Sequence, residues 1–135
     1  MEDQGRELEV APGQITFEQW RQVDIRVGQV KSVEKVVNKD RLLKLVVDFG
    51  SVGERTVIAG IAPTFSDPNA WPEKLIGKRF GFVINLEPRK MAGIVSQAMI
   101  LAAPDEHVVD QVVLIGCGDA QIGSRLAARV VSLGL

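Results

Sequence analysis

A succession of five short segments with strand-like patterning runs from residue 25 to residue 103 and limits the folds open to this 135-residue chain. In the first segment, residues 25–37, apolar side chains recur every two or three positions, as on one buried face of a strand. Glycine, proline and asparagine residues bound the segments, as they do at strand ends. The five predicted strands are residues 25–37, 42–50, 55–61, 78–86 and 94–103. We therefore expect an all-β chain.

The order of the other elements narrows the fold class further. A short helix is predicted over residues 16–22, because Thr16 and Gln19 have the spacing of a capping box. Gly28 interrupts the first strand, which predicts a bulge or bend there. One helical turn is expected near residues 73–76, in a proline-containing loop between the third and fourth strands. Five strands with a helix at that point match the OB-fold, a small five-stranded Greek-key barrel.

Two further segments flank the predicted barrel of residues 15–103. Residues 1–14 are polar and acidic and are expected to form a flexible tail. Residues 104–135 form a C-terminal strand extension with two apolar stretches. Those apolar side chains need a cover, either the barrel wall or a second copy of the chain, since exposed strand edges pair readily. The sequence does not decide between these two alternatives, and we expect a homodimer that uses this extension.

Composition excludes several classes of protein. The apolar runs are far shorter than the roughly 18 residues of a membrane span, so no membrane partner is expected. The acidic N-terminus lacks the apolar region of a secretory signal, and one cysteine forms no internal disulfide. Together these features favour a cytoplasmic location. The net charge is −1, but residues 20–90 hold thirteen Lys and Arg against eight Asp and Glu, a balance that attracts phosphate locally.

No set of residues in the sequence predicts catalysis, a metal site or a cofactor. His107 is the only histidine and lies in a polar loop, where a solvated side chain is the simpler interpretation. Cys117 lies between two glycines, without the lysine of a phosphate loop or a nearby histidine to activate a nucleophile. We therefore expect a binding module and not an enzyme.

The groups that remain are those that bind a sugar-phosphate surface. Positive charge comes from Arg41, Lys44, Lys78, Arg79, Arg89 and Lys90, and neutral polar groups come from Asn85, Ser96 and Gln97. Phe80 and Phe82 alternate along one strand and are expected in the core, which leaves few aromatic side chains for base stacking. Recognition of phosphate, sugar and shape is expected instead. The alternative is a surface of mixed, solvated charges.

Several stretches resemble, in order and spacing, the OB-fold tRNA-binding domain that forms the C-terminal appendix of many methionyl-tRNA synthetases. They are DIRVGQV, NKDRLLKLVVDFG, RTVIAGI, PEKLIGKRF and NLEPRKMAGIVSQAMILAA. The same domain occurs as free-standing, structure-specific tRNA-binding proteins and in synthetase-associated cofactors that give rise to a cytokine. The resemblance covers about residues 16–103. It implies a non-catalytic, homodimeric module that holds tRNA by its folded outer corner, alone or beside an aminoacyl-tRNA synthetase.

Carried over residue by residue, the resemblance implies an RNA-facing site. Its members are Asn85, Arg89, Lys90, Ser96, Gln97 and Met99, with phosphate contacts added by Arg41 and Lys44. Lys78 joins the set by its charge. Each residue has a structural alternative. Asn85 caps a turn, Arg89 and Lys90 are solvated loop charges, Ser96 and Gln97 satisfy backbone groups at a bulge, and Met99 belongs to the core.

Two other functions compete with tRNA binding. A secretion-chaperone branch, similar to CsaA, has the same barrel and a dimer that grips extended polypeptides, and its opening FEQW-x-x-VDIRVG resembles residues 17–28. The second competitor is a dimerisation module in which Arg89 and Lys90 only keep the chain soluble.

Overall fold

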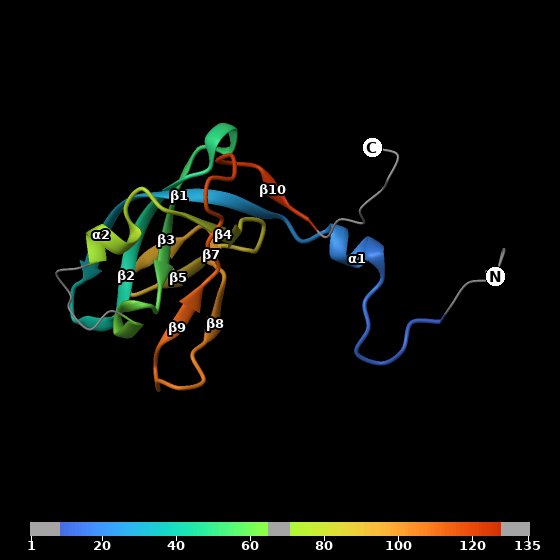
Figure 1. The fold of residues 1–135 in the computed structure, drawn as a ribbon, viewed down its shortest axis with the longest axis horizontal. Coiled ribbons are helices and arrows are strands. Elements are labelled where there is room, and N and C mark those ends of the chain that lie inside the picture. The colour runs from blue at the N-terminus through green and yellow to red at the C-terminus, as the bar shows by residue number, and fades with distance from the viewer. Residues whose placement is uncertain (1–8, 65–70, 128–135) are drawn as a thin grey trace.

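The structure, a computed structural model, describes residues 9–64 and 71–127. An antiparallel sheet curls into a barrel, with its strands in the order β3-β2-β1-β4-β7 (Figure 1). These strands are β1 (Ile25–Val36), β2 (Lys39–Asp48), β3 (Glu54–Ala59), β4 (Arg79–Val83) and β7 (Met99–Ile100). The predicted all-β fold is confirmed. Short helical segments connect the strands: η1 (Gly50–Val52), η2 (Ala62–Thr64) and α2 (Trp71–Leu75).

Alternation along the strands builds the core. Leu43, Leu45 and Val47 of β2 are fully buried, while the residues between them are partly exposed. The rings of Phe49 and Phe82 meet edge to face in this core, with centroids 5.3 Å apart at 88°. The period of two that the sequence showed is therefore the inward and outward alternation of a barrel wall.

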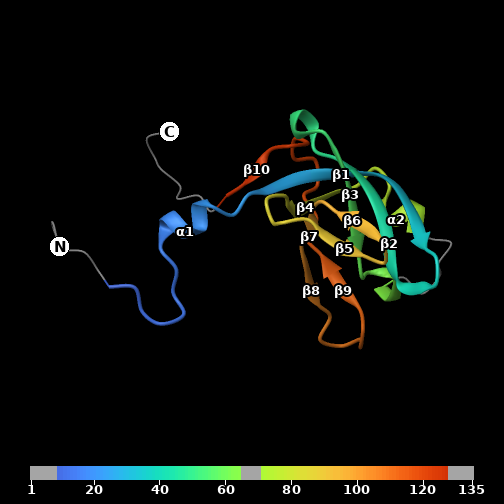
Figure 2. The same ribbon diagram turned by 180° about the vertical axis from the view of Figure 1, so that it is seen from behind.

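Helix α1 (Phe17–Arg21) precedes the barrel and carries the capping box that its sequence predicted. The Gln19 N–H donates to Thr16 Oγ1 at 3.0 Å, and the Thr16 N–H donates to Gln19 Oε1 at 2.8 Å. The helix buries none of its own residues, and Phe17 is 66% exposed. Figures 1 and 2 show α1 projecting from the end of the barrel where β1 begins. Among the described residues, no helix has the length and apolar character to cross a membrane.

The fifth predicted strand is wrong as a single element. Residues 94–103 are divided among β6 (Ile94–Ser96), β7 and β8 (Ala102–Pro104), which belong to three different sheets. The preceding residues 87–93, expected as a connection, contain β5 (Arg89–Met91), which pairs with β6 in a hairpin. Around Ser96 and Gln97 the chain bonds to β3 through two side chains and one backbone N–H.

The sequence predicted a bulge or a bend at Gly28, and the structure places no bulge at this residue. Gly28 pairs in regular register with Phe80, and β1 shifts register against β2 between Val30 and Ser32. Glycine is required at residue 28 by close packing, since a Cβ there would lie 2.5 Å from Cγ1 of Val47.

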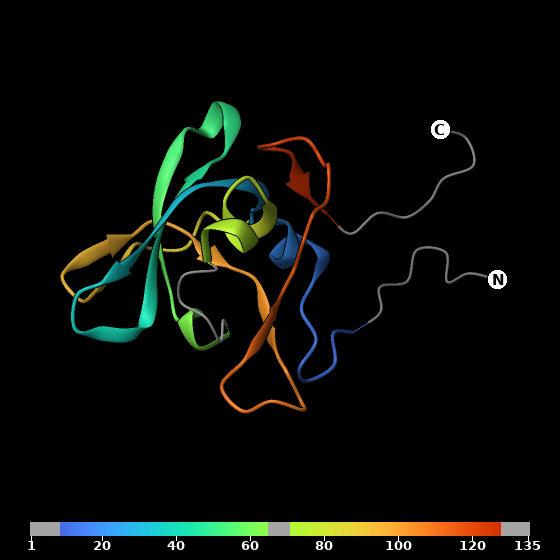
Figure 3. The same ribbon diagram turned by 60° about the vertical axis from the view of Figure 1, so that its left-hand side comes forward.

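The chain after residue 104 returns to the barrel. β9 (Val112–Leu114) pairs with β8, and both Val112 and Leu114 pack against the core. β10 (Arg125–Leu126) then pairs with the start of β1 (Figure 3). The barrel wall thus covers part of the apolar extension. The stretch with Val130, Val131 and Leu133 lies outside the described residues, and the segment boundaries stay predictions.

Candidate nucleic-acid interface

An apolar groove of about 250 Å³ lies between β3, the β5–β6 hairpin and the segment from β7 to β9. Aliphatic side chains line most of it, among them Ile58, Ile61 and Ile100. Of the nine predicted site residues, the groove brings together Arg89, Ser96, Gln97 and Met99. Met99 is 42% exposed, so it is available to a ligand and is not a core residue.

Ser96 and Gln97 close the barrel beside this groove. The Ile58 N–H donates to Ser96 Oγ at 3.0 Å, and the hydroxyl donates to the Ala98 carbonyl at 3.0 Å. The Thr56 N–H donates to Gln97 Oε1 at 2.9 Å, and the Gln97 N–H returns a bond to the Thr56 carbonyl at 2.8 Å. Both side chains therefore satisfy backbone groups, as the structural alternative proposed. Their contact with RNA stays a prediction.

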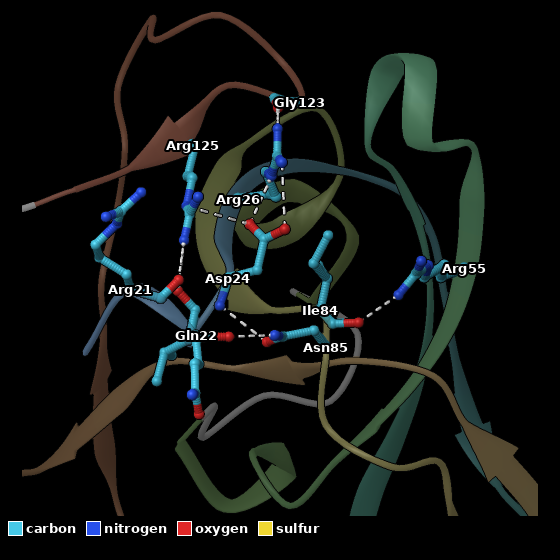
Figure 4. A network of polar contacts seen from close by, with 10 residues as sticks. Arg21, Gln22, Asp24, Arg26, Arg55, Ile84, Asn85, Gly123 and Arg125 are labelled. Carbon is cyan, nitrogen blue, oxygen red and sulfur yellow. Dashed lines mark hydrogen bonds and ion pairs between the residues drawn. The ribbon is translucent and has the colours of Figure 1, made fainter. Parts of the chain in front are cut away.

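Arg55 strengthens the seam, by which we mean the contact of Ser96 and Gln97 with β3. Arg55 was not among the residues predicted from the sequence. Its guanidinium donates to the Ile84 carbonyl at 2.6 Å, as Figure 4 shows, and to the Gln97 carbonyl at 3.3 Å. These bonds tie the start of β3 to the end of β4 and to the link between β6 and β7. The sequence holds no signal for this role, because both partners lie more than 25 residues away along the chain.

The β5–β6 hairpin presents Arg89 and Lys90. Ala92 and Gly93 form its turn with φ of 52° and 81°, the left-handed values that a tight hairpin turn requires. Arg89 lines the groove and Lys90 does not, as expected when neighbouring strand residues face opposite ways. Both side chains are exposed, and within the described part of the chain neither has a hydrogen bond or an ion pair. They are thus free to meet an anion.

Arg41 and Lys44 on β2 are already paired within the chain. Arg41 bonds Asp110 at 3.2 Å, and Lys44 lies 3.4 Å from Glu34. Exposed pairs of this kind contribute about 0–1 kcal/mol, so a phosphate can displace either acid. Lys44 is the register partner of Ile58, which lines the groove, and so it flanks the same surface.

Asn85 holds the link between α1 and β1. Its Oδ1 accepts from the Asp24 N–H at 2.8 Å, and its Nδ2 donates to the Gln22 carbonyl (Figure 4). Asp24 in turn accepts from Arg26 Nε at 2.7 Å, and this bond raises the pKa of the Arg26 guanidinium. Asn85 does not line the groove, and its predicted contact with RNA stays untested. Its observed bonds resemble the capping role that was the alternative.

Lys78 lies apart from the other predicted residues. It lines a separate, polar hollow beside α2, with Lys74 and Arg79. The structure therefore separates the nine residues into a groove set, flanking residues on β2 and the hairpin, a structural residue near α1, and Lys78.

The chemistry of the groove is set by its apolar lining and the cations beside it. Within residues 9–64 and 71–127, no three His, Cys, Asp or Glu side chains gather to hold a metal ion. An apolar surface beside unpaired cations suits a ligand with both apolar and anionic parts. Nucleic acid and extended polypeptide are both ligands of that description.

Comparison with known proteins finds a family model and several relatives. The family model described as "Putative tRNA binding domain" matches residues 25–125. A methionine–tRNA ligase of Porphyromonas gingivalis is 46% identical over 91 residues, and one of Methanopyrus kandleri is 40% identical over 94. These alignments cover 67% and 68% of the chain but only 12% and 13% of the relatives, so the chain spans about an eighth of their length.

Two solved structures share the fold over most of their length. The crystal structure of a MetRS related protein from Pyrococcus horikoshii superposes with a TM-score of 0.72 and 37% identity, covering 84% of this chain and 97% of that one. The crystal structure of the chaperone CsaA from Bacillus anthracis gives a TM-score of 0.71 and 27% identity, covering 84% and 99%. Both branches named in the sequence analysis are thus structural neighbours.

Proposed function

The chain belongs to the tRNA binding domain family, and on that premise we propose that it is a non-catalytic module that binds folded tRNA through phosphate and sugar contacts. The observation that carries this proposal is the presentation of Arg89 and Lys90 by a hairpin beside an apolar groove, with no partner for either side chain among the described residues. Cations without protein partners bind phosphate without first giving up an ion pair.

The rigid seam beside the groove supports the same mechanism. Ser96, Gln97 and Arg55 fix the barrel edge through hydrogen bonds to backbone. In this proposal they position the hairpin, while Arg89 and Lys90 contact phosphates and Met99 contacts a sugar or base face. Lys44 and Arg41 add phosphate contacts once they exchange Glu34 and Asp110 for RNA. A preorganised surface loses less entropy on binding than a flexible one.

The relatives suggest a place for this module. Because methionine–tRNA ligases contain a segment similar to this chain, we propose that the chain works beside an aminoacyl-tRNA synthetase, presenting tRNA to it. Its similarity to a structure titled MetRS related protein fits this role. A cytoplasmic location remains part of the same proposal.

A second candidate function is favoured by the character of the groove. Its lining is mainly aliphatic, and the chaperone CsaA of Bacillus anthracis has a similar fold. An extended polypeptide could lay apolar side chains in the groove, with Arg89 near its acidic groups. This chaperone-like function predicts binding that persists or strengthens as salt increases.

A capture experiment over a salt series tests the two candidates. The chain is immobilised and offered tRNA and an unfolded polypeptide, and the bound fraction of each is measured. We expect retention of tRNA that falls by about 0.7–0.9 log units per log unit of salt for each phosphate neutralised. Retention of polypeptide alone, at all salt concentrations, would replace the tRNA function by the chaperone-like one.

A further inference from the structure

A second hollow, larger than the groove, lies between the end of α2, the start of β4 and the turn that follows β9. Its volume is about 470 Å³. Its charged lining residues are Lys74, Lys78, Arg79 and Asp119, and it shares no lining residue with the groove. Figure 3 shows α2, in yellow-green, well separated from the gold β5–β6 hairpin across the barrel. This basic pocket is therefore a separate surface.

The cations of the basic pocket are available to a ligand. The side chains of Lys74 and Lys78 are exposed, and neither makes a hydrogen bond or an ion pair among residues 9–64 and 71–127. Arg79 donates through one guanidinium nitrogen to the Ala120 carbonyl at 2.8 Å, which fixes its direction. Three like charges around one hollow repel one another, and an anion between them removes that repulsion.

One wall of the pocket is bare backbone. A Cβ added at Gly116 or at Gly118 would meet no described atom within 4 Å beyond its own chain neighbours, so the described residues leave the space in front of them open. A ligand can approach this wall closely, as it does at glycine-containing phosphate sites. The volume is in the range that holds a molecule of nucleotide size, and one phosphate alone needs far less.

We propose that the basic pocket binds the ribose-phosphate backbone of RNA, as a second contact for the tRNA of the proposed function, on which this inference rests. The three cations match phosphates, and the exposed Asp119 carboxylate accepts a hydrogen bond from a ribose 2′-hydroxyl. Base stacking is not part of this contact, because Phe80, the aromatic residue of the lining, is buried. An RNA that fills both the groove and the pocket must be folded around the barrel.

Asp119 gives the pocket a preference for RNA over DNA that a simple basic patch lacks. A carboxylate repels phosphate, so it weakens the binding of DNA, which has no 2′-hydroxyl to offer in return. In RNA the hydrogen bond offsets that repulsion. The pocket therefore selects ribose over deoxyribose.

Tests with matched variants separate this site from the groove. In the first, the dissociation constant for tRNA is measured across a KCl series for the wild-type chain and for a Lys74→Ala, Lys78→Ala double variant. We expect binding about tenfold weaker and a log-log salt slope shallower by about 1.4–1.8, since two phosphate contacts are lost. A Lys74→Arg, Lys78→Arg variant keeps the charge and should bind as the wild type does. Thermal unfolding shows whether each variant remains folded.

The second arm uses a stem-loop made as RNA and as DNA of the same sequence. Asp119→Ala should raise affinity for the DNA form and lower the ratio of RNA to DNA affinity by severalfold. An unchanged ratio would contradict the ribose contact. If the wild type binds tRNA and the Lys74 and Lys78 change leaves affinity and slope intact, the pocket proposal fails while the groove proposal survives. If the wild type does not bind tRNA, the proposed function itself fails.

Discussion

At the scale of single residues, Gly28 is a position where the core has no room for an added side chain. A Cβ there would lie 2.5 Å from Cγ1 of Val47, 2.6 Å from Cε1 of Phe49 and 2.9 Å from Cδ1 of Phe82. These three side chains are fully buried, so none can move into solvent to make room. The glycine lets β1 and the aromatic pair approach each other.

We expect Gly28→Ala to lower the free energy of unfolding by about 1–3 kcal/mol, the usual effect of overpacking. Urea denaturation followed by tryptophan fluorescence measures it. Gly60→Ala is the matched control. A Cβ at residue 60 would meet its nearest atom at an ordinary 3.9 Å, and the backbone φ of Gly60 is not positive, so alanine fits there without strain. A Gly28 variant as stable as the Gly60 variant would show that the core is looser than described.

Cys117 illustrates a residue whose chemistry the fold suppresses. Burial raises the pKa of its thiol, so the nucleophilic thiolate is scarcer at neutral pH than in a free cysteine. The loop between Gly116 and Gly118 does not activate this side chain. The raised pKa agrees with the expectation that Cys117 is not an activated nucleophile.

At the scale of elements, the seam between β3 and the β6–β7 link holds the candidate site in place. Ser96 is 5% exposed, and its hydroxyl is the acceptor for the Ile58 N–H. Without that oxygen, a buried backbone donor loses its partner. The hydrogen bond thus matters more for keeping the barrel closed than the small size of the side chain suggests.

We expect Ser96→Ala to lower the free energy of unfolding by about 1–3 kcal/mol, the penalty of an unsatisfied buried group. Amide hydrogen exchange gives the local test, and the Ile58 amide should exchange faster in the variant than in the wild type. Ser32→Ala, at an exposed position of β1, serves as the control. Equal protection of Ile58 in all three proteins would mean that another group closes the seam.

The elements also show what sequence patterns reveal and what they hide. β1 to β4 were predicted because alternation is a local property of each strand. The division of residues 94–103 was hidden, since Ser96 and Gln97 bond to β3, some forty residues earlier. The hairpin of Arg89 was hidden because its turn places an alanine, Ala92, at a φ of 52°, where glycine or asparagine is the usual signal.

For the candidate site, the sequence revealed the types of the residues but not their neighbours or partners. The candidate residues between positions 85 and 99 stood out by type, and the structure brings four of them, Arg89, Ser96, Gln97 and Met99, to one groove. Their aliphatic neighbours, such as Ile58 and Ile61, look like ordinary core residues in the sequence. Pairing is also invisible there, since Arg41 meets Asp110 across 69 residues of chain. Charge alone therefore did not distinguish the paired cations from the free ones.

At the scale of the whole molecule, the distribution of exposed apolar residues favours a homodimer, which remains our proposal. Ile15 just before α1 and Phe17, the first residue of α1, are exposed, and α1 projects from the barrel (Figure 2). Arg125 of β10 donates to the Arg21 and Val23 carbonyls, so α1 and the C-terminal extension meet at one end of the barrel. A second copy that covered this end would bury both.

Sedimentation equilibrium measures the assembly directly. We expect a mass of twice the 14.7 kDa of one chain at micromolar concentration. Phe17→Glu, which places a charge on the exposed face of α1, should shift the mass toward one chain without unfolding the barrel. A wild-type chain that sediments as a monomer would rule out the dimer, and a dimeric Phe17→Glu variant would place its interface elsewhere.

The central claim is that Arg89 and Lys90, on the hairpin beside the groove, contact tRNA. The measurement that tests it most directly is the tRNA dissociation constant of an Arg89→Ala, Lys90→Ala double variant, with an Arg89→Lys, Lys90→Arg exchange as the charge-keeping control. We expect the double variant to bind more than about tenfold more weakly, with a shallower salt dependence, and the exchange to retain most of the affinity. A folded double variant that binds tRNA as tightly as the wild type would contradict the claim.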